Sequence, residues 1–436
     1  GNEMDKCPAV IDIPTGLGKT MVMAIWLIAR AQHPDKVPTR LIYVVDRRTV
    51  VDQATYLALK IHGNCPQALG IEPPAISTLR GQLADNRKWS RDPSRPAIII
   101  GTVDLIGSAL LFSGYRSSYK RRPLEAGLLG QDSLLVLDEA HLSKPFEKLI
   151  CAIGDDGSFQ KTRKGNAQGK PMRVVRMSAT SGNSADSKPP FTLQFDANGN
   201  LTGEDANDST IAGRFGAKKR LAITMLGEKD KLVDKLASAA IELVAPSNPQ
   251  HTLVIGQRIV IFTRRPDDAR TIAETIRKSK KGDFAKAVEV LTGTMRGLKR
   301  DELVEKPVFT ERWLNGDLKP KDPANQSPVF LIATSAGEVG FDLNADHMVC
   351  DATTIDSLIQ RLGRVNRRGL GDAQIHLFAE PSKKEKGGKP KKLEGLDKAI
   401  ASTIDLLQGI EDVSPKNIVA LKASDAWTKK ADNDRS

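Results

Sequence analysis

The sequence predicts an α/β fold with two domains, each built on a mainly parallel sheet flanked by helices. The chain has 436 residues, which is too long for one ordinary domain. Short apolar runs alternate with amphipathic stretches, a pattern typical of buried parallel strands linked by helices. A second series of apolar runs begins near residue 258, so the two halves look like two copies of one architecture.

The expected elements follow from these runs in chain order. An apolar strand opens "VIDIPTGLGKT" (10–20), and "MVMAIWLIARAQ" (21–32) is an expected helix. Further strands are expected at 40–45, 97–100, 134–137 and 173–178, and then at 258–263, 329–334 and 347–352. The polar stretches at 154–171 and 181–220 indicate loops or insertions, and 381–392 indicates a Lys/Gly/Pro linker before one more helix.

We therefore expect a first domain at 1–215, a second at 216–380, and a basic linker with the start of a C-terminal helical region at 381–436. The chain looks like a piece of something longer.

Composition narrows the function classes. There are 65 Lys and Arg against 53 Asp and Glu, a net charge of +12 that suggests a polyanionic partner, although a basic surface can also serve solubility alone. The cysteines are scattered without CxxC spacing, so disulfides and zinc are not expected and a reducing cytoplasm is. They are Cys7, Cys65, Cys151 and Cys350. No apolar run is long enough to span a membrane, and no signal peptide is present.

The stretch "VIDIPTGLGKT" has the context that a phosphate-binding loop requires, a strand, a Gly-rich turn and a helix. Its glycines let backbone N–H groups curl around phosphates, and the helix N-terminus adds partial positive charge. Lys19 would reach the β- and γ-phosphates, and Thr20 would bind Mg²⁺. The strict pattern has Gly where Ile13 stands, and the form P-T-G-x-G-K-T relaxes that position.

"LLVLDEAHLSK" (134–144) is an apolar strand that ends in two carboxylates. Asp138 can hold Mg²⁺, and Glu139 can deprotonate an attacking water. Either acid alone would more often be a cap or surface residue, whereas the pair in a chain with a phosphate loop indicates hydrolysis. His141 is either a solvated loop histidine or a relay from the nucleotide site.

Two later motifs complete the candidate site. The hydroxyls of "RMSAT" (176–180) either cap a helix or sense the γ-phosphate. "TTIDSLIQRLGRVNRRG" is predicted to be helical, with Thr354 as N-cap and Gly369 as the stop. That helix would place Gln360, Arg364 and Arg367 on one face, aimed at the γ-phosphate from the second domain. The alternative is a solvated basic helix.

The ordered set PTGLGKT, DEAH, SAT, "ATSAGEVGFDLNAD" (333–346) and QRLGRVNRR resembles that of superfamily 2 helicases. More narrowly, "YVVDRRTVVDQA" (43–54), "IIIGTVDLIGSALLFSGY" (98–115) and "LTGTMRGLKRDEL" (291–303) resemble the CRISPR-associated helicase–nuclease of type I interference systems, in its I-U (or I-G) form.

The resemblance implies two tandem RecA-like domains with an ATP cleft between them. It also implies a monomeric, cytoplasmic, Mg²⁺-dependent helicase that hydrolyses ATP to unwind DNA in antiviral defence. The implied partners are single-stranded DNA and an RNA-guided surveillance complex, with no membrane.

The family's site residues carry over by motif. The nucleotide-binding set is Pro14, Thr15, Gly16, Leu17, Gly18, Lys19 and Thr20 in the first domain, with Glu338, Gly340 and Asp342 in the second. Thr20 and Asp138 would bind Mg²⁺, and Glu139 would activate water. His141, Ser178 and Thr180 would couple the two activities. Gln360, Arg364 and Arg367 would complete the catalytic cleft.

Strand-tracking residues are expected in or beside the family's nucleic-acid motifs, and a solvated surface charge is the alternative for each arginine. They are Arg47, Arg48, Thr102, Arg264, Arg265, Thr292 and Arg296. Such contacts go mostly to phosphates. With 5% aromatic residues, base stacking is expected to be a minor contributor.

The family also carries a nuclease domain built on an adjacent His-Asp pair. None of the six histidines here is followed by Asp, so we expect the nuclease to lie outside this sequence.

Two other functions compete with the DNA helicase. One is an RNA helicase of the DEAH-box type, which ATPase stimulation by DNA or RNA would separate. The other is a nucleic-acid clamp without turnover, against which the intact Lys19, Glu139, Arg364 and Arg367 count.

Overall fold

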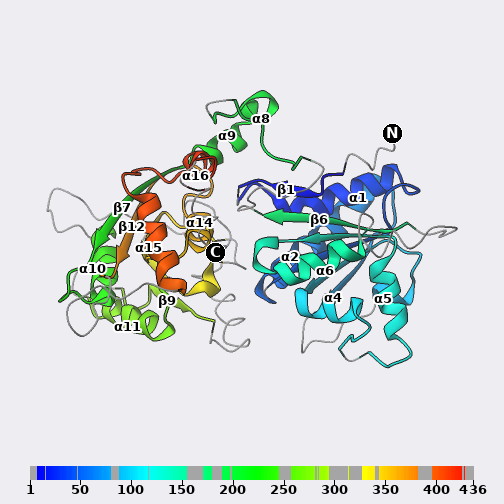
Figure 1. Ribbon diagram of the computed structural model, residues 1–436, viewed down its shortest axis with the longest axis horizontal. Helices are drawn as coiled ribbons and strands as arrows, with labels where there is room; N and C mark the ends of the chain where they lie inside the picture. The colour runs from blue at the N-terminus through cyan, green and yellow to red at the C-terminus, as the bar shows by residue number, and fades with distance from the viewer. Residues whose placement is uncertain are drawn as a thin grey trace. The chain divides into compact units, whose positions relative to one another are not determined.

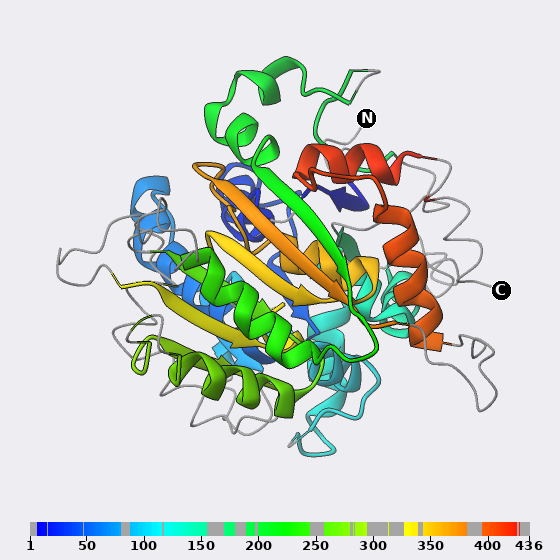
Figure 2. The same cartoon turned by 90° about the vertical axis from the view of Figure 1, so that its left-hand side faces the viewer.

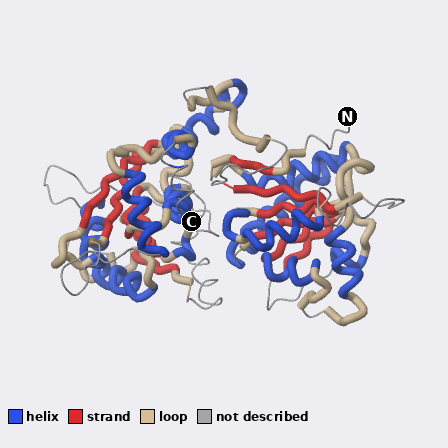
Figure 3. Tube along the Cα trace, in the orientation of Figure 1, coloured by secondary structure: helices blue, strands red, loops and turns tan. Residues whose placement is uncertain are grey.

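The computed structural model divides the chain into two compact units, residues 1–193 and 194–436 (Figure 1). Each unit is a sheet of strands with helices packed around it (Figure 3). Backbone alone is described for residues 48, 49, 178 and 336. The structure describes residues 7–14, 16–46, 48–79, 88–115, 117–154, 170–178, 189–196, 199–244, 257–279, 282, 284–293, 313, 327–338, 343–381, 395–424 and 427.

The sheet of the first unit has six parallel strands in the order β1-β6-β5-β2-β4-β3. In that order, the strands are β1 (Val10–Asp12), β6 (Met172–Ser178), β5 (Ser133–Leu137), β2 (Arg40–Val45), β4 (Ala97–Thr102) and β3 (Ala75–Leu79). Because the strands are parallel, the residues that follow β1 and β5 lie at the same carboxyl edge. The phosphate-loop sequence and the paired carboxylates are these residues.

Helices cover both faces of this sheet, as a parallel sheet requires. Side chains from α1 (Val22–Gln32) and α2 (Arg48–Leu69) form one core cluster with Leu41 and Tyr43 of β2. The neighbouring residues Ile42 and Val44 face the opposite cluster, because successive strand residues point to opposite faces. That second cluster is formed with α3 (Lys88–Arg91), α4 (Val103–Leu110), α5 (Arg122–Gly130) and α6 (Lys144–Ile153).

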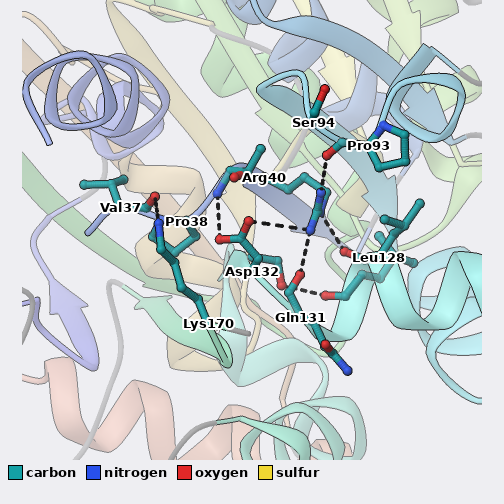
Figure 4. A network of polar contacts seen from close by, with 12 residues as sticks. Val37, Pro38, Arg40, Pro93, Ser94, Leu128, Gln131, Asp132 and Lys170 are labelled. Carbon is teal, nitrogen blue, oxygen red and sulfur yellow. Dashed lines mark hydrogen bonds and ion pairs between the residues drawn. The ribbon is translucent and has the colours of Figure 1, made fainter. Parts of the chain in front are cut away.

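A buried arginine ties the amino edge of the same sheet together (Figure 4). The guanidinium of Arg40 donates to the carbonyls of Leu128 (2.9 Å), Pro93 (2.9 Å) and Gln131 (3.0 Å) and lies 3.8 Å from the Asp132 carboxylate. Burial lowers the pKa of Arg40, and Asp132 opposes that shift. These contacts fix the edge opposite the phosphate loop, so they belong to the scaffold of the unit.

The second unit repeats the design with six parallel strands in the order β7-β12-β11-β8-β10-β9. In that order, the strands are β7 (Lys218–Met225), β12 (Asp372–Ala379), β11 (His347–Asp351), β8 (Arg258–Phe262), β10 (Val329–Ala333) and β9 (Val288–Leu291). Strands β8, β10 and β11 are buried throughout, which explains why their sequences are continuous apolar runs.

Helices α10 (Leu232–Val244) and α11 (Pro266–Arg277) pack together against one face of the second sheet. Figures 1 and 2 show α14 (Ile355–Leu362) and α15 (Gly395–Leu407) on the other side. The last helix is α16 (Pro415–Lys422), and Ile400, Leu407 and Ile418 from this C-terminal segment lie in the core of the unit. None of the helices in the described ranges is long and apolar enough to cross a bilayer.

The predicted α/β class and parallel sheets are confirmed, and the predicted helix at 21–32 is present as α1. The polar stretch 181–220, expected to be loops, is only partly so. It contains α8 (Gly203–Asn207) and α9 (Ser209–Phe215), because Asp208 caps α9 by accepting from two backbone N–H groups. It also contains the start of β7, a strand that the sequence did not predict. Most of 154–171 and of the expected linker lies outside the described residues.

The boundary between the compact units falls between Leu193 and Gln194, upstream of the boundary at 215 expected from the sequence. Residues 194–215 pack with the second unit. The Phe195 and Phe215 rings lie 5.3 Å apart, and Lys416 donates to the side chain of Asn200.

Candidate nucleotide site and arginine-bearing turn

The phosphate-loop sequence forms a tight turn between β1 and the 3₁₀ turn that leads into α1. Gly16 (φ 97°) and Gly18 (φ 83°) adopt left-handed backbone conformations that favour glycine. The Lys19 side chain is 8% exposed, and its amine has no hydrogen-bond partner in the described part of the chain. Burying an ammonium group without such a partner is energetically unfavourable unless an anion binds beside it.

The two carboxylates follow β5 at the same edge of the sheet. The Glu139 Oε1 atom lies 3.6 Å from Lys19 Nζ, and its Oε2 atom has no hydrogen-bond partner among the described residues. Glu139 itself has φ 48°, a left-handed conformation that is strained for a side chain of this size. Burial raises the pKa of the Asp138 carboxyl, with Glu139 adding to the shift and Lys19 opposing it.

Tyr43 joins the two residues expected to bind Mg²⁺, a role that the sequence did not reveal. Its hydroxyl donates to Asp138 Oδ2 at 2.7 Å and also interacts with the Thr20 side chain. Burial raises the pKa of Tyr43 well above its ordinary value, and Asp138 adds to the shift. The only sequence signal was a single tyrosine in the apolar run "RLIYVV".

These residues fit a nucleotide triphosphate with Mg²⁺. Left-handed glycines, a buried amine without a hydrogen-bond partner and a carboxylate hydrogen-bonded near a threonine hydroxyl are the donor set for phosphates and a hard cation. In the described ranges, no three His, Cys, Asp or Glu side chains cluster as a metal site. Mg²⁺ keeps several waters and binds through one or two protein ligands, a role that Thr20 and Asp138 would fill.

The coupling residues are only partly described. His141 Nδ1 lies 3.5 Å from Glu139 Oε2, so His141 contacts the proposed base directly. The backbone of Ser178 pairs with Asp12 in the β1–β6 ladder, which brings "RMSAT" beside the phosphate loop. Thr15 and Thr180 lie outside the described residues.

The predicted helix across 354–369 is wrong in its C-terminal half. Helix α14 ends at Leu362, and Gly363 is its C-cap. Beyond it, Val365 forms a parallel bridge with Ala345, and Asn366 has φ 43°. Arg364 and Arg367 therefore lie on a turn and not on a helix face with Gln360, because the bridge competes with a further helical turn.

The guanidinium of Arg364 is held by a main-chain carbonyl. Its Nε and Nη2 atoms donate to the Glu338 oxygen at 3.0 and 2.9 Å. The carboxylate of Glu338 instead accepts from Arg361, which also pairs with Asp351 (2.8 and 2.9 Å). Burial opposes the charge of Arg361, yet Asp351 and Glu338 outweigh burial and raise its pKa. Arg361 is 1% exposed, and its ion pair fixes Glu338, the residue whose carbonyl accepts from Arg364.

Arg367 is fixed through its backbone, whose N–H donates to Asn344 Oδ1 at 2.8 Å. Burial lowers the pKa of Arg367 to about 10, and Arg214 and Arg368 add to the shift. Lys219 of β7 donates to the carbonyl of Leu362 at 2.7 Å, which caps the C-terminus of α14 just before the turn. Burial lowers the pKa of Lys219 to about 7, with Asp412 opposing the shift and Arg367 adding to it.

The end of the turn is closely packed. Gly369 has φ 71°, and a Cβ there would lie 1.9 Å from the carbonyl oxygen of Gly213. Only glycine fits this position.

Of the remaining candidate residues in the second unit, Gln360 lies in the described part of the chain. Gln360 is buried in α14 at 7% exposure. Gly340 and Asp342 lie outside the described residues.

The expected strand-tracking residues are not equally available. Thr102 and Thr292 are buried at the ends of β4 and β9. Arg264 pairs with Asp351 and Glu380 at 3.3 Å each, and with Arg265 it lines a cavity of about 370 Å³. Arg47, the side chain of Arg48, and Arg296 lie outside the described residues. Their nucleic-acid roles stay predictions.

Two protein families match the chain in sequence. Residues 4–187 match the DEAD/DEAH box helicases, and residues 255–370 match the C-terminal part of the CRISPR-associated nuclease/helicase Cas3. With its two parallel sheets, the chain is similar to superfamily 2 helicase cores, and the expected RecA-like architecture is confirmed. The match in the second half and the fold shared with T. fusca Cas3 make the chain similar to Cas3-type helicase cores. No curated protein matches the sequence significantly.

Solved structures share this fold at low sequence identity. The T. fusca Cas3 structure with AMPPNP is 16% identical with a TM-score of 0.57, over 97% of this chain and 51% of that one. Helicase Lhr from Mycobacterium smegmatis, bound to ssDNA and AMP-PNP, is 15% identical with a TM-score of 0.52, over 87% and 45%. The DUF1998 helicase MrfA bound to DNA is 16% identical with a TM-score of 0.57, over 87% and 45%. This chain thus spans about half the length of these relatives, and the likeness concerns the fold.

Proposed function

We propose that this chain is the ATP-driven motor of a helicase that translocates on single-stranded DNA in type I CRISPR interference. The observation that carries the proposal is the pair Lys19 and Glu139. Their charged groups lie 3.6 Å apart at the carboxyl edge of the first sheet, and each has a buried atom without a hydrogen-bond partner in the described residues. An ATPase needs these two groups, one for the phosphates and one for water.

The first unit would hold the nucleotide. The backbone around Gly16 and Gly18 and the Lys19 amine would bind the phosphates. Thr20 and Asp138 would hold Mg²⁺, which supplies neutralisation of phosphate charge when bound. Tyr43 orients both of these ligands, since its hydroxyl interacts with each.

Glu139 would accept the proton of the attacking water at Oε2. Lys19 and His141 lie on either side of this carboxylate, at 3.6 and 3.5 Å, and keep it aimed. The strained backbone of Glu139 fits this role, because such strain is found where a side chain must point in one direction.

The second unit would supply positive charge to the transferred phosphate from Arg364 and Arg367. An arginine in this role is worth roughly 10³–10⁵ in rate in other nucleotidases. Arg364 is oriented by the Glu338 carbonyl before any nucleotide arrives, which lowers the entropy lost on engagement. Closure of the two units on ATP and relaxation after hydrolysis would then move the strand.

The choice of DNA and of the surveillance complex as partners rests on the Cas3-type match and on relatives solved with DNA. The test is steady-state ATPase activity of the chain alone, with a single-stranded DNA, and with an RNA of the same sequence. We expect stimulation by DNA and little by RNA. Stimulation by RNA alone would favour the DEAH-type RNA helicase. No turnover under any condition would favour a clamp.

A further inference from the structure

Three exposed aromatic residues follow closely in sequence on the first unit, in the connection between α4 and α5. Phe112, Tyr115 and Tyr119 are 58%, 68% and 85% exposed. Aromatic residues make up 5% of the chain, and two of its four tyrosines are here. Leu111 and Leu124 are also exposed, at 56% and 46%. An exposed concentration of this kind in a chain poor in aromatics indicates a contact surface.

Phe112 occupies a backbone position that usually belongs to glycine. Its φ is 58°, and its N–H donates to the carbonyl of Ala109 while the N–H of Ser113 donates to that of Ser108. These two bonds define a Schellman motif at the end of α4, in which the left-handed residue is most often Gly. An exposed phenylalanine that is kept in a strained position suggests a role for its ring.

Polar contacts give this connection a fixed shape. Glu125 is 8% exposed and accepts from the Ser117 hydroxyl, and Arg121 lies 3.6 Å from its other oxygen. Arg121 also donates to Ser90 at 3.1 Å. Ser117 and Arg121 are therefore held against Glu125 of α5.

The same connection is strongly basic. Residues 111–124 contain four basic residues and no acid. They are Arg116, which stands between the two tyrosines in sequence, and Lys120, Arg121 and Arg122, which directly follow Tyr119. Aromatic faces combined with positive charge are the composition that binds single-stranded nucleic acid, since bases stack on the rings and the cations neutralise phosphates.

We propose that the α4–α5 connection is a base-stacking site for a single nucleic-acid strand, formed by Phe112, Tyr115 and Tyr119. Helix α4 starts directly after Thr102, which is buried, and its eight residues span about 12 Å to the exposed aromatic residues. The inference rests on the proposed function for its strand, and it adds base stacking to the phosphate contacts that the motifs predict. A purely protein-docking patch is the competing explanation.

The test compares two oligonucleotides of equal length, oligo-dT and a strand with abasic sites at every position, for binding by the whole chain at one salt concentration. We expect the double variant Tyr115→Ala/Tyr119→Ala to lose roughly tenfold in affinity for oligo-dT for each stacked base. Its affinity for the abasic strand should stay close to that of the unaltered chain. The matched control is Tyr56→Ala on α2, a tyrosine that is 62% exposed with Lys60 over its ring, and it should change neither affinity.

Equal losses on both strands would overturn the proposal, because the tyrosines would then act through phosphate contacts or folding. Unchanged binding to both strands would also overturn it and leave these aromatic residues to a protein partner. In either case DNA-stimulated ATPase activity tests the proposed function separately. If that stimulation is present without a base-dependent loss, the motor stands and only the stacking site fails.

Discussion

At the scale of single residues, the buried Lys19 amine is the most sensitive point of the molecule. We expect Lys19→Ala to abolish ATP hydrolysis and to weaken nucleotide binding, because the β- and γ-phosphates would lose their main positive partner. ATPase assays and fluorescent nucleotide titration would measure both effects. Lys60→Ala, an exposed lysine on α2, is the control, and near-normal turnover of Lys19→Ala would refute the phosphate-loop assignment.

Glu139→Gln should separate binding from chemistry. The amide keeps the size of the side chain but cannot accept the proton of water at Oε2. Nucleotide affinity should therefore persist, while turnover should fall by about 10²-fold or more. Single-turnover hydrolysis beside equilibrium binding measures this. Turnover equal to that of the unaltered chain would show that Glu139 is not the base.

Sequence patterns predicted residues for binding the nucleotide, but they did not predict the residues that orient them. The two motifs that contain Lys19 and Glu139 each have fixed local spacing, so a single sequence suffices to find them. Tyr43 is 95 positions from its partner Asp138, and the Arg361–Glu338 pair is 23 positions apart. Such contacts depend on which strands become neighbours, and a tyrosine in an apolar strand or an arginine in a basic helix carries no sign of its partner.

At the scale of elements, the turn after α14 decides how the arginines act. Arg364 donates twice to one carbonyl, and a lysine cannot reproduce that planar fork. We expect Arg364→Lys to lose nearly as much ATPase activity as Arg364→Ala, with a smaller effect on nucleotide affinity. Arg368→Lys is the matched control, since Arg368 is exposed on the same turn. Equal, mild losses at both positions would indicate a solvated basic turn.

The helix prediction failed at this turn for a physical reason. The sequence from 354 to 369 has helical composition, and the Ala345–Val365 bridge that ends the helix comes from a distant segment. Eight strands fall on the predicted apolar runs, because buried parallel strands are continuous apolar runs, whereas β3, β9 and β12, like β7, were not predicted. β7 escaped notice because it is an edge strand with alternating exposure and four basic or polar positions among its eight residues.

Lys219 should make the stability of the second unit depend on pH. Its folded-state pKa of about 7 lies below the ordinary value of 10.5, so the unfolded chain binds more protons between these values. The free energy of unfolding should therefore rise with pH across that window, by up to about 1.4 kcal/mol per pH unit from this group. Urea unfolding at pH 7.5 and 9.5 would measure the rise.

The variant Lys219→Met should remove that contribution, because methionine does not titrate. It should also slow ATP turnover more than it changes KM, since the cap on α14 precedes Arg364. Identical pH dependence in the variant would show that Lys219 is not the titrating group.

At the scale of the whole molecule, the net charge of +12 predicts strongly salt-dependent binding to a strand. The logarithm of the binding constant should fall with the logarithm of salt concentration by about 0.7 for each phosphate neutralised on a single strand. Fluorescence anisotropy with oligo-dT between about 50 and 200 mM salt gives the slope. A flat response would mean that the charge serves solubility alone.

The parallel pairing of β7 with β12 affects when the second unit can fold during synthesis. Lys218–Met225 is made early in the second unit, but its one strand partner among the described residues is Asp372–Ala379, and Val413 completes its other edge by donating to the carbonyl of Lys219. At 5–20 residues per second, a ribosome needs roughly 10 to 40 s to reach that point. Through this interval β7 waits with both edges open, while the first unit, whose last strand ends at Ser178, can already fold. Nascent chains of this protein would therefore be most vulnerable to misassembly and most in need of a chaperone after their nucleotide-binding half is finished and before their arginines are in place.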